Sequence, residues 1–373
     1  MSDIADLSKG IGISKDQLSA DGEPCILYGE LYTKYKSETI KEVISKTNID
    51  NTKLVKSKAN DVIIPCSGET AEEIATARCV LKDDILLGGD LNIIRLHGYD
   101  GSFMSYQLNG KRKYDIAKVA QGVSVVHLYG EHLKNIKTIN PSLNEQKKIA
   151  NLLSLLDERI STQNKIIEKL QSLIKGICNN YFLKLSHSQE MKSIRLGDIL
   201  KERNEYCCKD GTFVHGTLSK DGLFPKTERW NRDFLVKEEN KKYKITHLDD
   251  ICYNPANLKF GVICRNIYGD LIFSPIYVTF EVSKKVNIGF IELYLTNRNF
   301  IEKIRKFEQG TVYERMSVSP EDFLSYKIRI PSLSEQTFFY QKIQRLKNCS
   351  QNELEHLNLY KKLRQYLLRQ MFI

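Results

Sequence analysis

The residues best suited by type to do chemistry form two short motifs, and each motif is incomplete. Asn254-Pro255-Ala256-Asn257 approaches the Asn-Pro-Pro-aromatic sequence of amino-group methyltransferases, but it lacks the second proline and the aromatic ring that stacks on a flipped base. Glu145-Gln146-Lys147 has the E-x-K spacing of some nucleases, but no Pro-Asp pair precedes it. We therefore interpret the first motif as a turn at the end of a strand and the second as the start of a helix.

The other reactive side chains show no pattern of catalysis or metal binding. No G-x-x-x-x-G-K-[ST] phosphate loop occurs, so ATP hydrolysis is not indicated. The nine cysteines contain no C-x-x-C pair, and no Cys/His set has the spacing of a zinc site. We therefore expect no catalytic residue, no metal and no cofactor in this chain, and a binding protein rather than an enzyme. Cysteines in this arrangement are typical of reduced thiols in a cytoplasmic protein.

The composition is that of a globular protein with a moderate basic excess. The 373 residues are 41% hydrophobic and 27% charged, and the formal net charge is +10. No apolar run approaches the 18 residues of a membrane span, and no signal-peptide core opens the chain. The excess lies in the second half, because residues 1–140 are net −1 and residues 191–330 net +5. Such a charge is compatible with a polyanionic partner, although many proteins of this size reach it.

A repeat without gaps organises the chain. Pro141–Phe182 and Pro331–Phe372 match at an offset of 190 residues, which indicates a duplication. Both copies begin with the S-x-x-E pattern of a helix capping box. The identical residues of the first copy are Pro141, Ser142, Leu143, Glu145, Gln146, Leu156, Leu173 and Phe182.

Each copy predicts a helix of about 40 residues, roughly 60 Å long. Apolar residues recur at four- and three-residue spacing, so we expect the two helices to pack against each other along these stripes; an ordinary helical hairpin is the alternative. The first stripe is Ile149, Leu153, Leu156, Ile160, Ile167, Leu170, Ile174 and Ile177, interrupted by Gln163. The second is Ile343, Leu346, Leu354, Leu357, Leu363 and Leu367.

A further set of apolar residues on the first helix lies off its main stripe. These residues predict a docking surface for a partner subunit; contact with the helix's own globule is the alternative. They are Leu152, Leu155, Ile166 and Leu173.

The segments before each helix are rich in short strand patterns separated by Gly- and Asn-containing turns. Asp61–Cys66, Leu91–Leu96 and Leu271–Phe273 are examples, whereas Gly289–Lys306 predicts a helix. We therefore expect an α+β protein, in which two pseudo-repeated, β-rich globules are joined by two long helices. The predicted boundaries are 1–140, 141–190, 191–330 and 331–373.

This order, together with the P-x-L-x-E-Q start of each helix, resembles the specificity subunit of type I restriction–modification systems over nearly the whole chain. The first copy is the closer match, because Leu155-Leu156-Asp157 fits the family pattern whereas the second copy has Leu346-Lys347-Asn348. The resemblance implies two target-recognition domains and an antiparallel coiled coil. Each domain would read one half of a bipartite site on double-stranded DNA.

The resemblance also implies the partners of the chain. Two methyltransferase subunits would dock on the helices, and motor–nuclease subunits would join the full complex. S-adenosylmethionine, ATP and Mg would then be bound by the partner subunits. Because the two globules differ in sequence, we expect an asymmetric, interrupted target, with the helix pair setting the gap between its halves.

Candidate DNA contacts are polar, basic or aromatic residues in loop-like stretches, the types that reach base edges and phosphates. Each of them is also an ordinary surface residue by type. They are Lys15, Tyr32, Thr33, Lys34, Tyr35, Lys36 and Ser67 in the first globule, and Ser219, Lys220, Lys226, Arg229, Trp230, Asn257 and Lys259 in the second. The basic runs Lys111-Arg112-Lys113 and Lys241-Lys242 are typical of solvated faces.

Three alternatives remain open from the sequence. A solitary methyltransferase with an unrecognised site would bind S-adenosylmethionine by itself. A coiled-coil scaffold would use its globules to bind protein. A truncated or silent specificity cassette would keep the fold but lose complete recognition of one half-site, since the first globule starts abruptly compared with the second.

Overall fold

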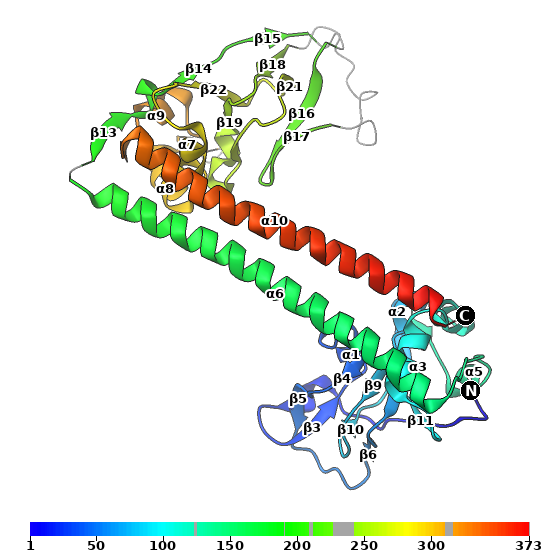
Figure 1. The fold of residues 1–373 in the computed structure, drawn as a ribbon. Helices are drawn as coiled ribbons and strands as arrows, with labels where there is room; N and C mark the ends of the chain where they lie inside the picture. The colour runs from blue at the N-terminus through cyan, green and yellow to red at the C-terminus, as the bar shows by residue number, and fades with distance from the viewer. Residues whose placement is uncertain (123–124, 190, 209–211, 227–241, 310–315, 373) are drawn as a thin grey trace. The chain divides into compact units, whose positions relative to one another are not determined.

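The computed structural model describes residues 1–373 except 123–124, 190, 209–211, 227–241, 310–315 and 373. The described residues form two compact units. Unit 1 comprises Met1–Ile166 and Glu353–Ile373, and unit 2 comprises Ile167–Asn352. Two long helices, α6 (Leu143–His187) and α10 (Leu333–Gln370), each contribute one segment to each unit (Figure 1). The predicted class of two β-rich globules and two long helices is confirmed.

Both long helices begin with the predicted capping box. The Ser142 hydroxyl donates to Glu145 Oε2 at 2.7 Å, and the Glu145 N–H donates back to the Ser142 oxygen at 3.4 Å. Ser332 and Glu335 repeat both bonds at the same distances. The serine hydrogen bonds hold the pKa of both carboxyl groups below the usual range. The E-x-K motif is therefore part of a helix cap.

Unit 1 is built on two five-stranded sheets. The first has the order β1 (Ala5–Lys9), β11 (Leu91–Leu96), β7 (Asp61–Pro65), β9 (Arg78–Val80) and β4 (Thr39–Ile40). The second has the order β2 (Leu18–Ser19), β5 (Ser45–Thr47), β3 (Glu23–Ile26), β10 (Leu86–Leu87) and β6 (Val55–Lys56). The shorter elements are η1 (Lys15–Gln17), α1 (Glu30–Thr33), β8 (Ser67–Gly68), α2 (Ala71–Ile74), α3 (Gly101–Asn109), α4 (Lys113–Val119), β12 (Val126–His127) and α5 (Gly130–Lys134).

Unit 2 has sheets of matching topology. One has the order β14 (Leu200–Glu202), β22 (Val278–Val282), β19 (Ile251–Tyr253) and β20 (Ile263–Arg265). The other has the order β15 (Tyr206–Cys207), β18 (Tyr243–Thr246), β21 (Leu271–Phe273), β16 (Val214–Ser219) and β17 (Gly222–Pro225). The remaining elements are β13 (Lys192–Arg195) paired with β23 (Lys327–Ile330), η2 (Leu196–Asp198), η5 (Pro255–Phe260), α7 (Ile288–Leu295), α8 (Arg298–Ile304), η6 (Arg305–Phe307) and α9 (Pro320–Ser325).

The two globules share their internal scaffold as well as their topology. Asp61 and Asp250 are both buried at the start of a central strand, and each forms a two-pronged pair with an arginine, Arg95 or Arg203. Each follows a residue in the left-handed region, with φ of 83° at Asn60 and 73° at Asp249. Because asparagine and aspartate tolerate that region better than other residues, the same tight entry into the strand is built twice.

A short helix joins each globule to its long helices. In unit 1, one face of α3 packs Met104 and Leu108 on the sheet, and the other packs Phe103 against Ala150 of α6 and Phe372 near the end of α10. In unit 2, α7 takes the corresponding place. The ring centroids of Phe103 and Phe372 are 5.2 Å apart, and those of Phe290 and Phe182 are 5.6 Å apart. Phe182 and Phe372 are the residues that end the two repeats.

Buried glutamines complete these joints. Gln146 and Gln336 are each 1% exposed. The Gln146 side chain accepts from the Asp100 N–H at 2.9 Å and donates to the Pro141 carbonyl at 2.7 Å. The Gln336 side chain accepts from the Asn287 N–H at 2.9 Å and donates to the Pro331 carbonyl at 2.9 Å. Asp100 and Asn287 are the N-cap residues of α3 and α7. The last residue of the P-S-L-x-E-Q motif therefore fixes one helix to another.

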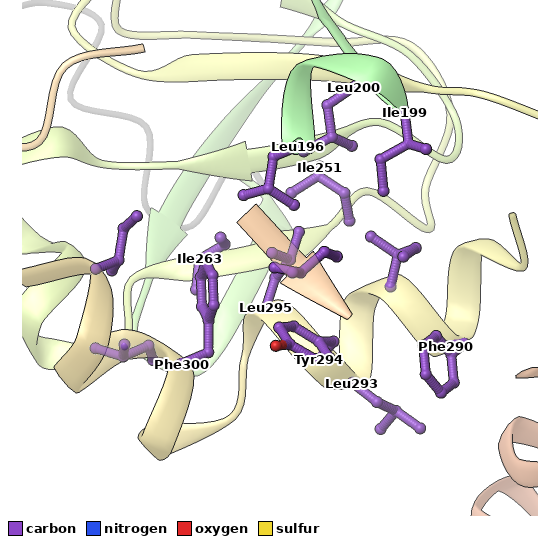
Figure 2. Packing of buried hydrophobic residues seen from close by; sticks show 14 of the residues in the cluster. Leu196, Ile199, Leu200, Ile251, Ile263, Phe290, Leu293, Tyr294, Leu295 and Phe300 are labelled. Carbon is purple, nitrogen blue, oxygen red and sulfur yellow. The ribbon is translucent and has the colours of Figure 1, made fainter. Parts of the chain in front are cut away.

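The core of unit 2 is largely aromatic where the long helices meet the globule. Figure 2 shows Phe290, Tyr294 and Phe300 among aliphatic side chains of the sheet and of α7. On the helix side, the Tyr181 and Phe339 rings stack with their centroids 3.8 Å apart, and both rings contact Phe290. Aromatic pairs of this kind stabilise a joint beyond the area that they bury.

Unit 1 replaces those rings by charges. The Arg364 guanidinium of α10 donates to Asp157 of α6 and, at 2.6 Å, to Glu38 of the globule. The Tyr106 hydroxyl of α3 donates to the second Asp157 oxygen at 2.7 Å. Burial disfavours the charged guanidinium, but the two carboxylates outweigh this effect and raise the pKa of Arg364. Burial and Asp157 raise the pKa of Tyr106, so its hydroxyl stays a donor.

The predicted stripe of α6 is confirmed, but that of α10 is wrong at two positions. Leu153, Leu156 and Ile167 of α6 are buried, whereas Leu354 and Leu363 of α10 are exposed. The buried or half-buried face of α10 in unit 1 runs through Glu353, Leu357, Tyr360, Arg364 and Leu368. This face has helical spacing, but three of its members are polar, so a search for apolar residues selected their neighbours.

One predicted element is shorter than expected. The helix predicted over Gly289–Lys306 divides at Asn297, whose side chain accepts from the Asn299 N–H and so starts α8. An asparagine that caps a new helix competes with continuation of the previous one.

Replacing either buried glutamine by alanine tests the joint. Gln146→Ala leaves the partly buried Asp100 N–H without its acceptor, and Gln336→Ala does the same to Asn287. We expect each variant to lower the free energy of unfolding of its own unit by about 1–3 kcal/mol. Hydrogen exchange should accelerate at Asp100 in one variant and at Asn287 in the other. Gln171→Ala, at an exposed position of α6, is the control, and a control as unstable as the variants would contradict this role.

Arg364→Leu tests the charged joint of unit 1. The variant leaves two carboxylates in poorly solvated surroundings without their cation, and we expect a loss of about 3–5 kcal/mol in the unfolding of unit 1. Chemical denaturation of the purified chain measures it, with Lys362→Leu at an exposed position of the same helix as the matched control. A loss equal to that of the control would show that the network contributes nothing.

Candidate nucleic-acid interface and helix surface

In unit 1 the structure brings together three of the predicted DNA contacts. The Tyr32 hydroxyl donates to the Ser67 carbonyl at 3.0 Å, and Lys36 Nζ lies 3.4 Å from the Tyr32 carbonyl. The Ser67 hydroxyl lies 3.3 Å from His127 Nδ1 of β12. Burial raises the pKa of the Tyr32 hydroxyl, with a further contribution from Glu73, so this side chain remains a hydrogen-bond donor at neutral pH.

The other predicted contacts of unit 1 have different surroundings. Lys15 is exposed on η1, and Thr33 is exposed on α1. Lys34 donates to Glu30 at 2.6 Å and to Ser45 at 2.7 Å, which holds its ammonium group against the globule. The Tyr35 ring is buried in the core, and its hydroxyl accepts from the Ile44 N–H at 3.2 Å. None of these placements tests DNA contact directly, so all remain predictions.

In unit 2 three predicted contacts lie on or directly after the β16–β17 hairpin. Ser219 and Lys220 lie at its turn, where the Ser219 hydroxyl donates to the Gly222 carbonyl at 3.3 Å. Lys226 follows the hairpin and is exposed. Arg229 and Trp230 lie outside the described residues. The hairpin also presents Phe224, whose ring lies 6.5 Å from that of Tyr268, and both rings are exposed. Sequence reasoning missed this aromatic pair because its members are far apart in the chain.

The last two predicted contacts lie on η5, directly after β19. Asn257 and Lys259 are half-buried, and Lys259 Nζ lies 5.3 Å from the centre of the exposed Phe260 ring. The same segment settles the structural role of the incomplete methyltransferase motif. The Asn254 side chain accepts from the Ala256 N–H at 3.1 Å and caps η5. The motif is therefore the predicted turn at a strand end.

The four apolar residues predicted to bind a partner are exposed on α6. Leu152, Leu155 and Ile166 lie in unit 1 and Leu173 in unit 2, and the exposed fraction is 55% at Leu155 and 50% at Leu173. Sequence reasoning missed a matching set on α10, which comprises Leu354, Leu359, Leu363 and Tyr366. The 190-residue offset could have identified one of them, since Leu363 is the repeat equivalent of Leu173 and is itself 46% exposed.

Residues 1–172 match the family described as the type I restriction modification DNA specificity domain. Over 371 aligned residues, the chain is 24% identical to the type I restriction enzyme MjaVIII specificity subunit of Methanocaldococcus jannaschii; the alignment covers 92% of this chain and 85% of that protein. The fold is that of the type I restriction–modification S subunit from M. genitalium. That crystal structure aligns with a TM-score of 0.58 at 18% identity, over 100% of this chain and 94% of that one.

A second solved structure, described as showing complex assembly and conformational transition of the type I R-M system, aligns with a TM-score of 0.57 at 12% identity. It covers 98% of this chain and 95% of that one. Residues 1–172 thus match a DNA specificity domain, and the whole chain has the fold of type I S subunits. Among the residues that the structure describes, no helix is both long and apolar enough to cross a membrane.

Leu155→Lys and Leu173→Lys test the helix surface. Because both side chains are exposed, we expect the free energy of unfolding to change by no more than about 0.5 kcal/mol, while binding of a partner methyltransferase subunit weakens. Co-purification and calorimetry with that subunit measure the effect. Leu153→Ala, at a fully buried position of the same helix, should instead cost about 2–5 kcal/mol in stability. If both lysine variants still bind the partner fully, this surface has no docking role.

Proposed function

We propose that this chain is the DNA sequence-specificity subunit of a type I restriction–modification complex, and that each globule reads one half of an asymmetric, interrupted site. One observation carries the proposal: the two globules share their scaffold and their joints, but not their exposed side chains. Asp61 and Asp250, and Gln146 and Gln336, occupy equivalent positions. The candidate DNA contacts of the two globules differ: unit 1 has Tyr32, Lys36 and Ser67, and unit 2 has the hairpin of Ser219 and Lys220.

In such a division, one set of residues positions the globules and another set reads the DNA bases. Buried residues that are the same in both copies hold the globules on the helices, and surface residues that differ supply different hydrogen-bond patterns to base edges. Two unlike readers on one chain support two unlike half-sites. The basic excess of the chain, +10 overall, supports contact with phosphate groups through long-range attraction.

We propose that the helix pair sets the gap between the half-sites. Gln163 and Glu353 are repeat equivalents, and the Gln163 side-chain amide donates to the Glu353 carbonyl at 3.1 Å. The two copies of the repeat therefore meet at equivalent positions, as expected for segments related by a pseudo-twofold axis. A polar pair at such a position favours one register of two packed helices, and a fixed register supports a fixed spacing.

We further propose that the same helices dock two methyltransferase subunits. Leu173 and Leu363 are exposed at equivalent positions of the two copies, so the duplication offers two similar docking surfaces. In this proposal the chain itself is not catalytic and works in the cytoplasm. Methyl transfer with S-adenosylmethionine belongs to the methyltransferase subunits, and ATP- and Mg-dependent cleavage belongs to motor–nuclease subunits.

Methylome sequencing of cells that carry the complex tests the proposed reading. We expect one asymmetric motif made of two short halves and a non-specific gap. Tyr32→Phe with Ser67→Ala should relax the half read by unit 1, and Asn257→Ala should relax the other half, with about 1–3 kcal/mol of discrimination lost per base contact. Lys165→Gln, on the exposed side of α6, is the control and should leave both halves unchanged.

A continuous short motif would contradict the proposal, and so would changes in both halves caused by a variant in one globule. The purified chain separates the alternatives. Methylation of DNA by the chain alone would identify a solitary methyltransferase. Failure to bind genomic DNA both alone and with its methyltransferase subunit would leave a protein-binding scaffold.

A further inference from the structure

A cavity of about 320 Å³ in unit 1 lies between the turn that joins α3 to α4 and the last turns of α10. Its lining includes Lys111 from the turn, Lys113 from the start of α4, and Gln365 and Arg369 from α10. Tyr114, which is 70% exposed, forms another part of the wall. The sequence alone indicated only a solvated basic run at 111–113, because the α10 residues that complete the cavity lie at the other end of the chain.

A glycine allows these two parts of the chain to approach each other. A Cβ atom on Gly110 would lie 3.0 Å from the Leu368 carbonyl oxygen and 3.0 Å from that of Tyr106. Both distances are tighter than ordinary contacts, so the backbone of the turn packs directly on the end of α10. This approach places Lys111 and Arg369 on the same cavity.

The side chains that line the cavity include more cations than carboxylates. Lys111, Lys113 and Arg369 line it together with one acid, Glu72. Within the described part of the chain these three cations form no ion pair, whereas their neighbour Arg112 pairs with Asp115 at 3.4 Å. Like charges that share a concave wall repel one another and raise the local concentration of anions. The arrangement therefore favours a multiply charged anion over a neutral ligand.

The cavity continues into the surface that carries predicted base contacts. A second hollow is lined by Tyr32, Lys36 and Arg78, and it shares Lys113 and Glu72 with the first. Glu73 also lines this second hollow, whereas Lys111 and Arg369 line only the first cavity. A duplex read near Tyr32 and Ser67 would thus meet a basic surface that ends at Arg369.

We propose that Lys111, Lys113 and Arg369 form a binding site for phosphodiester groups of the DNA backbone, with the Gln365 amide as a further donor. The inference rests on the proposed function and extends it, because it makes the final turns of the C-terminal helix part of the DNA contact of unit 1. Contacts to phosphate fix the position of a protein on the duplex and carry no sequence information. The site therefore strengthens binding to every sequence and leaves the recognised motif unchanged.

The salt dependence of duplex binding by the full chain tests this site. Each phosphate contact contributes about 0.9 to the slope of log affinity against log salt. The triple variant Lys111→Gln, Lys113→Gln, Arg369→Gln should lower the magnitude of the slope by about 2–3, and it should weaken binding to a cognate and to a scrambled duplex by the same factor. Arg369→Lys keeps the charge and should keep the slope.

The matched control is Lys147→Gln, Lys165→Gln, Lys361→Gln, which removes the same charge from exposed helix positions of unit 1. Its slope should equal that of the wild type, and thermal unfolding should show that both triple variants are folded. Equal slopes for the cavity variant and the wild type would overturn the proposal. An equal fall of the slope in the control variant would also overturn it, because the effect would then come from net charge and not from this cavity.

The remaining outcomes identify other occupants. If the cavity variant keeps its DNA slope but loses binding of ATP or pyrophosphate, the site takes a free phosphate compound and the proposal is overturned. If it keeps its DNA slope but loses the methyltransferase subunit, the cavity takes an acidic protein surface, with the same consequence. A wild-type chain that binds no duplex either alone or with its methyltransferase subunit would contradict the proposed function itself, and the phosphate site would fall with it.

Discussion

A buried glutamine at the start of each long helix is the interaction on which the rest of the structure depends. Gln146 and Gln336 each bind two backbone groups: a carbonyl before the long helix and the N–H of the N-cap residue of α3 or α7. Buried backbone groups without partners are costly, so this one side chain couples the position of a globule to that of its helix. Every surface residue of the globule depends on that joint for its placement.

The joints are equivalent in plan but differ in chemistry. Both place a phenylalanine from the end of a repeat against α3 or α7. Beyond that pair, unit 1 uses the Arg364–Asp157–Glu38 network, whereas unit 2 uses stacked rings of Tyr181 and Phe339. A charged side chain placed against those rings would lose its partners, and buried charges without partners are strongly destabilising. Exchanging the α10 segments between the two joints would therefore be destabilising, and each segment of α10 fits one globule only.

The sequence predicted most of the architecture because the duplication repeats local signals. Two capping boxes, one apolar stripe and strand patterns such as Leu91–Leu96 are encoded within short windows. The second stripe was misjudged at Leu354 and Leu363 because Glu353, Tyr360 and Arg364 occupy the packed face. Their polar groups are satisfied by residues far away in the chain, which no periodicity reveals. For the same reason the cavity of Lys111 and Arg369 and the pair of Phe224 and Tyr268 were visible only in three dimensions.

The central claim is that two units with the same joints read different half-sites. Hydrogen exchange of the assembled complex on three duplexes tests it most directly: the full site, and the site with either half scrambled. The account predicts that scrambling one half removes DNA protection from the surface of one unit only. The amides of Asp100 and Asn287 should stay protected throughout, because the glutamine joints do not depend on DNA. Loss of protection in both units together, from either scrambled duplex, would contradict the account.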